Sequence, residues 1–167
     1  MNISKVHIEN FKIFKGSFDL ILNKGVNILV GNNEAGKSTI IEAIHLALTG
    51  LYNGKYLKNE LTQYVFNNEI IAEYIESLKT ENALLPPHIL IEIWMSGDGI
   101  DETLWGDKNT QKDIEGRGFS LKIEFDTDRY QKEYEELVKI GGIKTLPIEY
   151  YNVLSAIQGE KEFIIRC

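Results

Sequence analysis

The chain has 167 residues, a hydrophobic fraction of 43% and a formal net charge of −7 at pH 7, which fits one domain or one piece of a larger one. One cysteine, Cys167, excludes a disulfide framework, and no apolar run approaches the length of a membrane span. The acidic residues concentrate after residue 58 and oppose direct docking on a nucleic-acid backbone, so we expect a cytoplasmic protein with a solvated surface.

The first 50 residues predict strands followed by a helix. Residues 4–11 and 14–22 read as two strands, and residues 26–30, "VNILV", form a mostly apolar run typical of a strand buried on both faces. A helix is expected from Lys37, and Gly50 is expected to end it. Its predicted apolar face consists of Ile40, Ile41, Ile44, Ala47 and Leu48.

The remainder predicts a helical zone and then mostly strands. A polar linker leads to a helical zone over residues 60–79, with a break near Asn67 left open. Residues 88–96, 119–126, 145–154 and 162–167 read as strands, and residues 97–118 read as a long loop or insertion. Residues 128–140 predict a helix capped by Asp126 or Asp128 and stopped by Gly141.

This order predicts an α/β fold with a mixed sheet. The later strands alternate between apolar and polar residues, so they are expected to be antiparallel. We treat residues 1–167 as a single lobe with three zones: strands, phosphate loop and helix in 1–50, a helical zone in 51–87, and mainly strands with one helix in 88–167.

Residues 31–38, "GNNEAGKS", fit the phosphate-binding pattern G-x-x-x-x-G-K-[ST] in full. Such a loop curls so that backbone N–H groups point at a phosphate chain, and the following helix adds the positive end of its dipole. Lys37 would supply a charge for the phosphates and Ser38 a hydroxyl ligand for Mg²⁺. We therefore predict a nucleoside triphosphate site, with ATP and Mg²⁺ as cofactors, formed by Gly31, Asn32, Asn33, Glu34, Ala35, Gly36, Lys37, Ser38 and Thr39.

Two other classes of P-loop protein lack support in the sequence. A Ras-like GTPase needs an Asn-Lys-x-Asp element, which the chain does not contain, and Asp113-Ile114-Glu115-Gly116 matches only the letters of Asp-x-x-Gly. A nucleotide kinase would need an arginine-rich lid, but the chain has three arginines in all. A nucleotide panel that showed strong preference for GTP would revive these alternatives.

The stretch "IENFKIFKGSFDL…GVNILVGNNEAGKSTIIEAIHLALTG" resembles the N-terminal ATPase segment of the RecF/SMC-like branch of ABC ATPases. More narrowly, the chain is similar to the OLD family of ATP-dependent endonucleases. The likeness continues in "LTQYVFNNEIIAEYIESLK", "PPHILIEIW" and "IKTLPIEYYNV", although only the phosphate loop is specific. The resemblance implies an ABC-ATPase-like N-terminal lobe that is incomplete by itself.

The family resemblance also implies individual roles. Lys12, in Asn-Phe-Lys-Ile-Phe, corresponds to a residue that approaches the nucleotide, with a solvated turn lysine as the equal alternative. Phe11 and Phe14 are expected in the core. Gln158 is a candidate glutamine near Mg²⁺, although a surface glutamine before Gly159 is favoured.

The parts needed for hydrolysis and DNA cleavage are not evident. "LKIEFD", ending at Asp126, lacks the glutamate that follows the aspartate in a Walker B strand. "LSAIQGE" lacks the glycines of an ABC signature, and Asp126-Thr127-Asp128 suits helix capping better than a Toprim metal site. The catalytic residues are therefore unknown, and we expect the chain alone to bind ATP without hydrolysing it or cutting DNA.

Two functions remain open at this point. The chain is either the ATP- and Mg²⁺-binding N-terminal portion of an OLD-like or RecF-like ATPase, or a stand-alone, non-catalytic nucleotide-binding regulatory module. In the first case, the missing half would provide the homodimer contacts and the missing regions would provide the contacts with DNA. No membrane partner is expected in either case.

Overall fold

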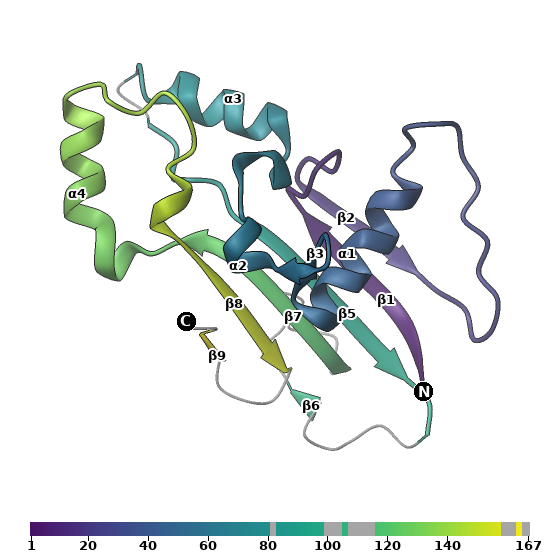
Figure 1. Ribbon diagram of the computed structural model, residues 1–167. Coiled ribbons are helices and arrows are strands. Elements are labelled where there is room, and N and C mark those ends of the chain that lie inside the picture. The colour runs from purple at the N-terminus through teal and green to yellow at the C-terminus, as the bar shows by residue number, and fades with distance from the viewer. Residues whose placement is uncertain (81–82, 99–104, 107–115, 158–162, 165–167) are drawn as a thin grey trace.

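The computed structural model describes residues 1–80, 83–98, 105–106, 116–157 and 163–164 (Figure 1). Its centre is a seven-stranded sheet in the order β2-β1-β5-β7-β8-β9, with β6 paired to β7. All of these pairings are antiparallel, which confirms the prediction for the later strands within an α/β fold. The described strands therefore form an antiparallel sheet and not the mixed sheet that was expected. The strands are β1 Asn2–Glu9, β2 Ser17–Ile21, β5 Ile89–Ser96, β6 Trp105–Gly106, β7 Gly116–Phe125, β8 Tyr151–Ile157 and β9 Phe163–Ile164.

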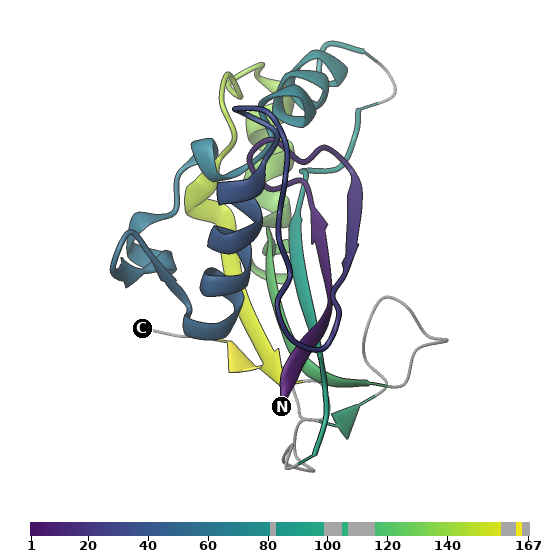
Figure 2. The ribbon, with the colours of Figure 1, turned by 90° about the vertical axis from the view of Figure 1, so that its right-hand side faces the viewer.

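The helices lie on one face and at one end of this sheet. Figures 1 and 2 show α1 over the face, next to a small hairpin of β3 and β4, whereas α3 and α4 gather at one end. The hairpin occupies the segment that the sequence suggested as a linker. None of the described helices is long and apolar enough to cross a membrane. The elements are α1 Lys37–Thr49, β3 Leu51–Tyr52, β4 Lys55–Tyr56, α2 Leu57–Glu60, α3 Asn68–Ser77 and α4 Thr127–Lys139, with 3-10 turns at Gln63–Val65 and Ile148–Tyr150.

The core forms where α1 packs on the sheet. The buried side of α1 consists of Thr39, Ile40, Ala43, Leu46 and Ala47. The facing strands contribute Val6, Ile8, Ile89, Ile91, Ile93, Leu121 and Ile123, all fully buried. Alternate residues of each strand point to one face, so this regular set follows directly from the predicted alternation.

Two residues of the predicted α1 face lie outside the core. Ile41 is 62% exposed and Leu48 is 42% exposed. They are seven positions apart and therefore share a stripe of the helix that no described element covers. The prediction of one wide apolar face was wrong because the helix has two apolar stripes, and only one meets the sheet.

The expected buried strand at residues 26–30 is also wrong. The segment forms no strand, and its alternate side chains Val26, Ile28 and Val30 are 89%, 80% and 88% exposed. It runs along the outside of the molecule between β2 and α1 (Figure 1). An apolar run shows that a segment is suited to burial, but no strand among the described residues pairs with it.

The predicted helical zone over residues 60–79 is broken, because Asn67 begins a new helix. The Asn67 side chain accepts hydrogen bonds from the N–H groups of Glu69 and Ile70 and so caps α3. It also donates to the carbonyl of Lys12 at 2.7 Å. This buried side chain thus fixes both the start of α3 and the turn after β1.

The predicted capping of α4 is confirmed at Asp126. Its carboxylate accepts from the N–H of Arg129 at 3.1 Å and from the side chain of Asn152 at 2.7 Å. α4 joins the core through Tyr134, whose hydroxyl lies 2.8 Å from that of Tyr74 on α3. Burial raises the pKa of both phenols, so they remain neutral partners at ordinary pH.

A polar network ties β1 and β2 together at His7. The two ring nitrogens of this buried histidine lie 2.9 Å from Asp19 and 2.9 Å from Glu9. Glu9 also contacts His88 at 3.0 Å, and Lys5 pairs with Asp19 at 3.1 Å. Each ring nitrogen of His7 therefore has a carboxylate neighbour, one from each strand.

We predict that Asn67→Ala lowers the free energy of unfolding by about 1–2 kcal/mol, the usual cost of losing an N-cap, with a further loss from the uncapped Lys12 carbonyl. Asn68→Ala is the matched control, because Asn68 is exposed and begins α3 without capping it. Urea unfolding of both variants measures the difference. Equal losses would contradict the double role of Asn67.

We also predict that stability falls as the pH drops from about 5.5 to 3. Burial raises the pKa of Glu9 and of Asp19, but their hydrogen bonds to His7 and its neighbours outweigh this and hold each pKa below its ordinary value. A lowered carboxyl pKa contributes stability above the ordinary values of 4.5 and 3.8, and this contribution disappears as the acid titrates.

The comparison that isolates the network is His7→Gln against His45→Gln, since His45 is exposed on α1. Urea unfolding at several pH values is expected to show a shallower acid dependence in His7→Gln only. An unchanged acid dependence in that variant would show that other carboxylates cause the loss.

Candidate functional site

The phosphate loop lies between the exposed segment 26–30 and the first turn of α1. The loop turns through a hydrogen bond from the N–H of Ala35 to the carbonyl of Asn32, and Glu34 and Gly36 both have positive φ, 71° and 83°. Gly36 is also the N-cap residue of α1 and has no side chain to cap it. The free N–H groups of the first helical turn therefore point toward the loop.

These residues line a hollow of about 280 Å³. Seven of the predicted site residues take part, together with one that the prediction missed. The lining consists of Asn33, Glu34, Ala35, Gly36, Lys37, Ser38 and Thr39, and of Ile13 from the turn after β1. Ile13 belongs to the motif "NFKIF", from which the sequence analysis named only Lys12 as a nucleotide-binding candidate.

Lys37 reaches back across its own loop. Its ammonium donates to the carbonyls of Gly31 at 2.6 Å and Asn32 at 2.7 Å. The predicted residues Gly31 and Asn32 thus contribute to the site by holding Lys37. The ammonium of Lys37, the positive charge of the loop, is therefore hydrogen-bonded to backbone carbonyls near the surface.

The turn after β1 presses on Gly36. A Cβ atom at Gly36 would lie 2.5 Å from Cδ1 of Ile13 and 2.9 Å from Cζ of Phe14. At Gly31, a Cβ would lie 3.0 Å from that of Ala35. Glycine is therefore required at position 36 for two separate reasons, the left-handed backbone and the lack of space.

Lys12 binds α1 at a different point from the hollow. Its ammonium donates to the carboxylate of Glu42 at 2.6 Å and lies 5.1 Å from the centre of the Tyr52 ring. Partial burial lowers the pKa of Lys12, but the interactions with Glu42 and Tyr52 outweigh it and leave that pKa raised. Lys12 is therefore a charged, partnered residue, and Glu42 is a contact that the sequence analysis did not identify.

The backbone around Lys12 is held on several sides. Asn10 accepts from the N–H of Gly16 and donates to the carbonyl of His88, both at 2.9 Å. The N–H of Lys12 donates to the carbonyl of Val65 at 3.0 Å. Asn10 and Lys12 both have positive φ, 57° and 51°. Phe11 is fully buried and Phe14 stacks on Phe18, as expected of residues that serve packing.

The other sequence candidates do not join this site. Asp126 caps α4, which lies away from the loop (Figure 1). Within the described ranges, no group of three or more His, Cys, Asp or Glu side chains is arranged to hold a metal ion. Gln158 and the stretch 113–115 lie outside the described residues, so the role of Gln158 stays a prediction.

We predict that Gly36→Ala destabilises the fold more than Gly50→Ala does. Both glycines have left-handed φ, 83° and 67°, which costs a residue with a side chain about 1–2 kcal/mol. Only Gly36 meets neighbouring atoms, because nothing lies within 4 Å of a Cβ at Gly50. Urea unfolding measures both variants, and losses of equal size would show that the turn after β1 does not press on the loop.

The chain is similar to known proteins over much of its length. The AAA_23 family model, described as "AAA domain", matches residues 5–164. The DNA replication and repair protein RecF of Vibrio vulnificus (strain CMCP6) is 33% identical over 114 residues, which cover 67% of this chain and 29% of that protein. The chain thus matches about a third or less of the length of such RecF relatives.

Other similarities are shorter or structural. The retron Ec83 probable ATPase of Escherichia coli is 44% identical over 52 residues, which cover 30% of this chain and 10% of that protein. The DNA double-strand break repair Rad50 ATPase of Thermoplasma acidophilum is 35% identical over 74 residues, or 44% of this chain and 8% of that protein. A solved structure from work on ATP-driven dimerization and DNA stimulated activation of SMC ATPases aligns with a TM-score of 0.44 and 18% identity, covering 77% of this chain and 65% of that one.

The family match covers nearly the whole chain, including the phosphate loop, α1 and the antiparallel sheet. The chain belongs to the AAA domain family AAA_23.

Proposed function

We propose that this chain binds ATP with Mg²⁺ at the phosphate loop and serves as the nucleotide-binding portion of an ATPase of the RecF and Rad50 type. The observation that carries the proposal is the hollow formed by the complete phosphate-loop motif at the N-terminus of α1. Backbone donors, a helix dipole and one lysine are the groups that bind a phosphate chain.

The residues present fit this ligand. Gly36 leaves no side chain between the loop and Ile13, so the backbone stays accessible. Lys37 can exchange its two carbonyl partners for phosphate oxygens without moving its backbone. Ser38, at the start of α1, would place a hydroxyl ligand on Mg²⁺. When bound, Mg²⁺ would neutralise part of the negative charge on the phosphates.

Lys12 is proposed as a second cation for the nucleotide. It is already charged, and its ammonium contacts α1 at Glu42, five residues after Lys37. To approach a phosphate, the Lys12 ammonium must leave the Glu42 carboxylate. The Lys12–Glu42 ion pair therefore opposes binding to the nucleotide, whereas the negative charge of the phosphate favours it. The family resemblance is the reason to propose that Lys12 binds the nucleotide, and loss of the contact with Glu42 is the free energy that this binding must offset.

The exposed apolar residues support completion of the site by further polypeptide. Val26, Ile28 and Val30 alternate on an unpaired segment directly before the loop, and Ile41 and Leu48 form an uncovered stripe on α1. A strand added beside residues 26–30 would bury these side chains.

The link to DNA is proposed from the relatives. RecF is named as a DNA replication and repair protein and Rad50 as a DNA double-strand break repair ATPase. Function as part of a DNA-linked ATPase is consistent with these names. The narrower assignment to an OLD-type endonuclease rests on the sequence resemblance, and the retron ATPase is compatible with it.

We predict that Lys37→Ala weakens ATP binding by roughly 10- to 150-fold, because a charge-assisted hydrogen bond contributes about 1.5–3 kcal/mol. Lys24→Ala is the matched control, since Lys24 is an exposed lysine in the preceding loop. Isothermal titration calorimetry with and without Mg²⁺ provides the measurement. Ser38→Ala is expected to weaken binding mainly in the presence of Mg²⁺.

Unchanged affinity in Lys37→Ala, with normal folding by circular dichroism, would overturn the site. Equal losses in Ser38→Ala with and without Mg²⁺ would remove the metal role but leave the nucleotide site in place. A marked preference for GTP over ATP would overturn the assignment of the nucleotide.

A further inference from the structure

Helix α4 has a second stripe that the core does not use. Its first stripe, with Tyr134 and Val138, packs inward. The second stripe consists of Glu133, Glu136, Leu137 and Ile140, whose spacing of three, four and seven residues places them on one side of the helix. Ile140 is 77% exposed, so an apolar end of this stripe faces solvent.

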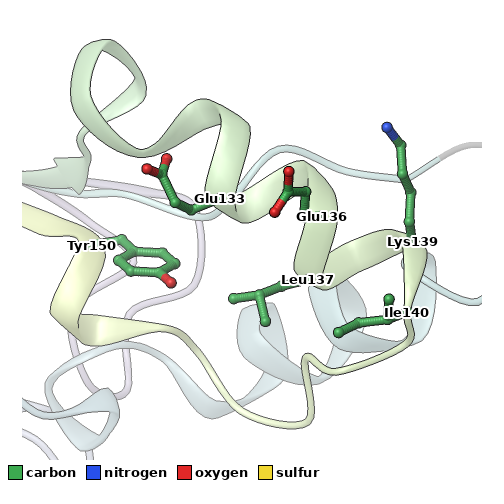
Figure 3. A pocket seen from close by; sticks show the side chains of 6 residues that line it. All are labelled: Glu133, Glu136, Leu137, Lys139, Ile140 and Tyr150. Atoms are coloured by element: carbon green, nitrogen blue, oxygen red, sulfur yellow. The ribbon is translucent and has the colours of Figure 1, made fainter.

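This stripe forms one wall of a hollow of about 480 Å³. Figure 3 shows two glutamate carboxylates along α4, the Leu137 and Ile140 side chains beneath them, and the Tyr150 ring across from them. Lys139 also lines the hollow, but its ammonium extends away from Tyr150 (Figure 3). The Tyr150 ring is held in place by stacking on Tyr130, with ring centres 4.8 Å apart.

The hollow therefore combines negative charge with an apolar floor and an aromatic wall. An arginine side chain matches all three features. Its guanidinium can pair with carboxylates one helical turn apart, its stem can cover Leu137, and its planar group can lie against the Tyr150 ring. An aliphatic neighbour of that arginine would cover the exposed Ile140.

We propose that this hollow, the α4 groove, is a docking site for a protein partner that presents an arginine and an aliphatic residue on one face of a helix. Charge complementarity selects this partner, because the carboxylates of Glu133 and Glu136 repel the phosphates of nucleic acid. The site is separate from the phosphate loop, because α4 and the start of α1 lie on opposite sides of the molecule (Figure 1). A partner can therefore bind here without covering the nucleotide hollow.

The test uses the full chain and a defined probe. The probe is a fluorescent alanine-based helical peptide of about 16 residues, long enough to form a helix, with arginine and leucine four positions apart in two repeats. Fluorescence anisotropy is expected to show saturable binding. A peptide with glutamine in place of arginine is expected to bind roughly two- to fivefold more weakly, the size expected when an exposed ion pair is lost.

The variant E133Q/E136Q removes the two carboxylates of the groove, and E76Q/E135Q is its charge-matched control on exposed positions outside it. Only the first variant is expected to weaken binding of the peptide, by roughly two- to fivefold. Ile140→Ser is expected to weaken binding of the peptide as well. Amide shifts in nuclear magnetic resonance spectra are expected to map to residues 133–140.

Several results would overturn the proposal. The first is that both double variants bind the peptide equally well, and the second is that the glutamine peptide binds as tightly as the arginine peptide. The others are amide shifts confined to another surface, and the absence of saturable binding by the wild-type chain at millimolar peptide. Sedimentation that shows a dimer of the chain lost in Ile140→Ser would assign the groove to a second copy and would equally overturn it. Nucleotide titration is independent of all these outcomes.

Discussion

The turn after β1 depends on two buried asparagine side chains, and the phosphate loop depends on that turn. Asn10 binds Gly16 and His88, and Asn67 binds the Lys12 carbonyl while capping α3. A buried amide that loses its partners costs more than the bond itself is worth, so these contacts are close to obligatory. They hold Ile13 against Gly36, and thereby connect the start of α3, the sheet and the nucleotide hollow in one rigid arrangement.

Much of this architecture follows from the sequence. The alternation in residues 88–96 predicts β5 and one buried face, because strand geometry imposes the period of two. The opposite face of β5, with Leu90, Glu92 and Trp94, is buried as well, which the alternation does not predict. The phosphate loop, its helix and the αL stop at Gly50 follow from local rules on glycine and helix ends. Asp126 as a cap follows in the same way. These features share one property, which is that residues near in sequence determine them.

The features that sequence analysis missed depend on contacts between distant segments. Ile13 enters the site because the turn after β1 meets residue 36, and Glu42 meets Lys12 across 30 positions. Asn67 lies 55 residues from the carbonyl that it binds. The exposed run at residues 26–30 shows a related limit of sequence analysis. Its apolar composition favours burial but does not indicate which segment would cover it.

The position of Lys37 has a consequence for the energetics of the loop. Its ammonium donates hydrogen bonds to the carbonyls of Gly31 and Asn32, so these carbonyls compete with a phosphate for the same cation. Binding of a phosphate is then an exchange of partners, and the measured affinity is a difference between two sets of charge-assisted bonds. The same bonds restrain the curvature of the loop. A lysine normally regarded as a ligand contact thus also acts as a tether that keeps its own binding site in shape.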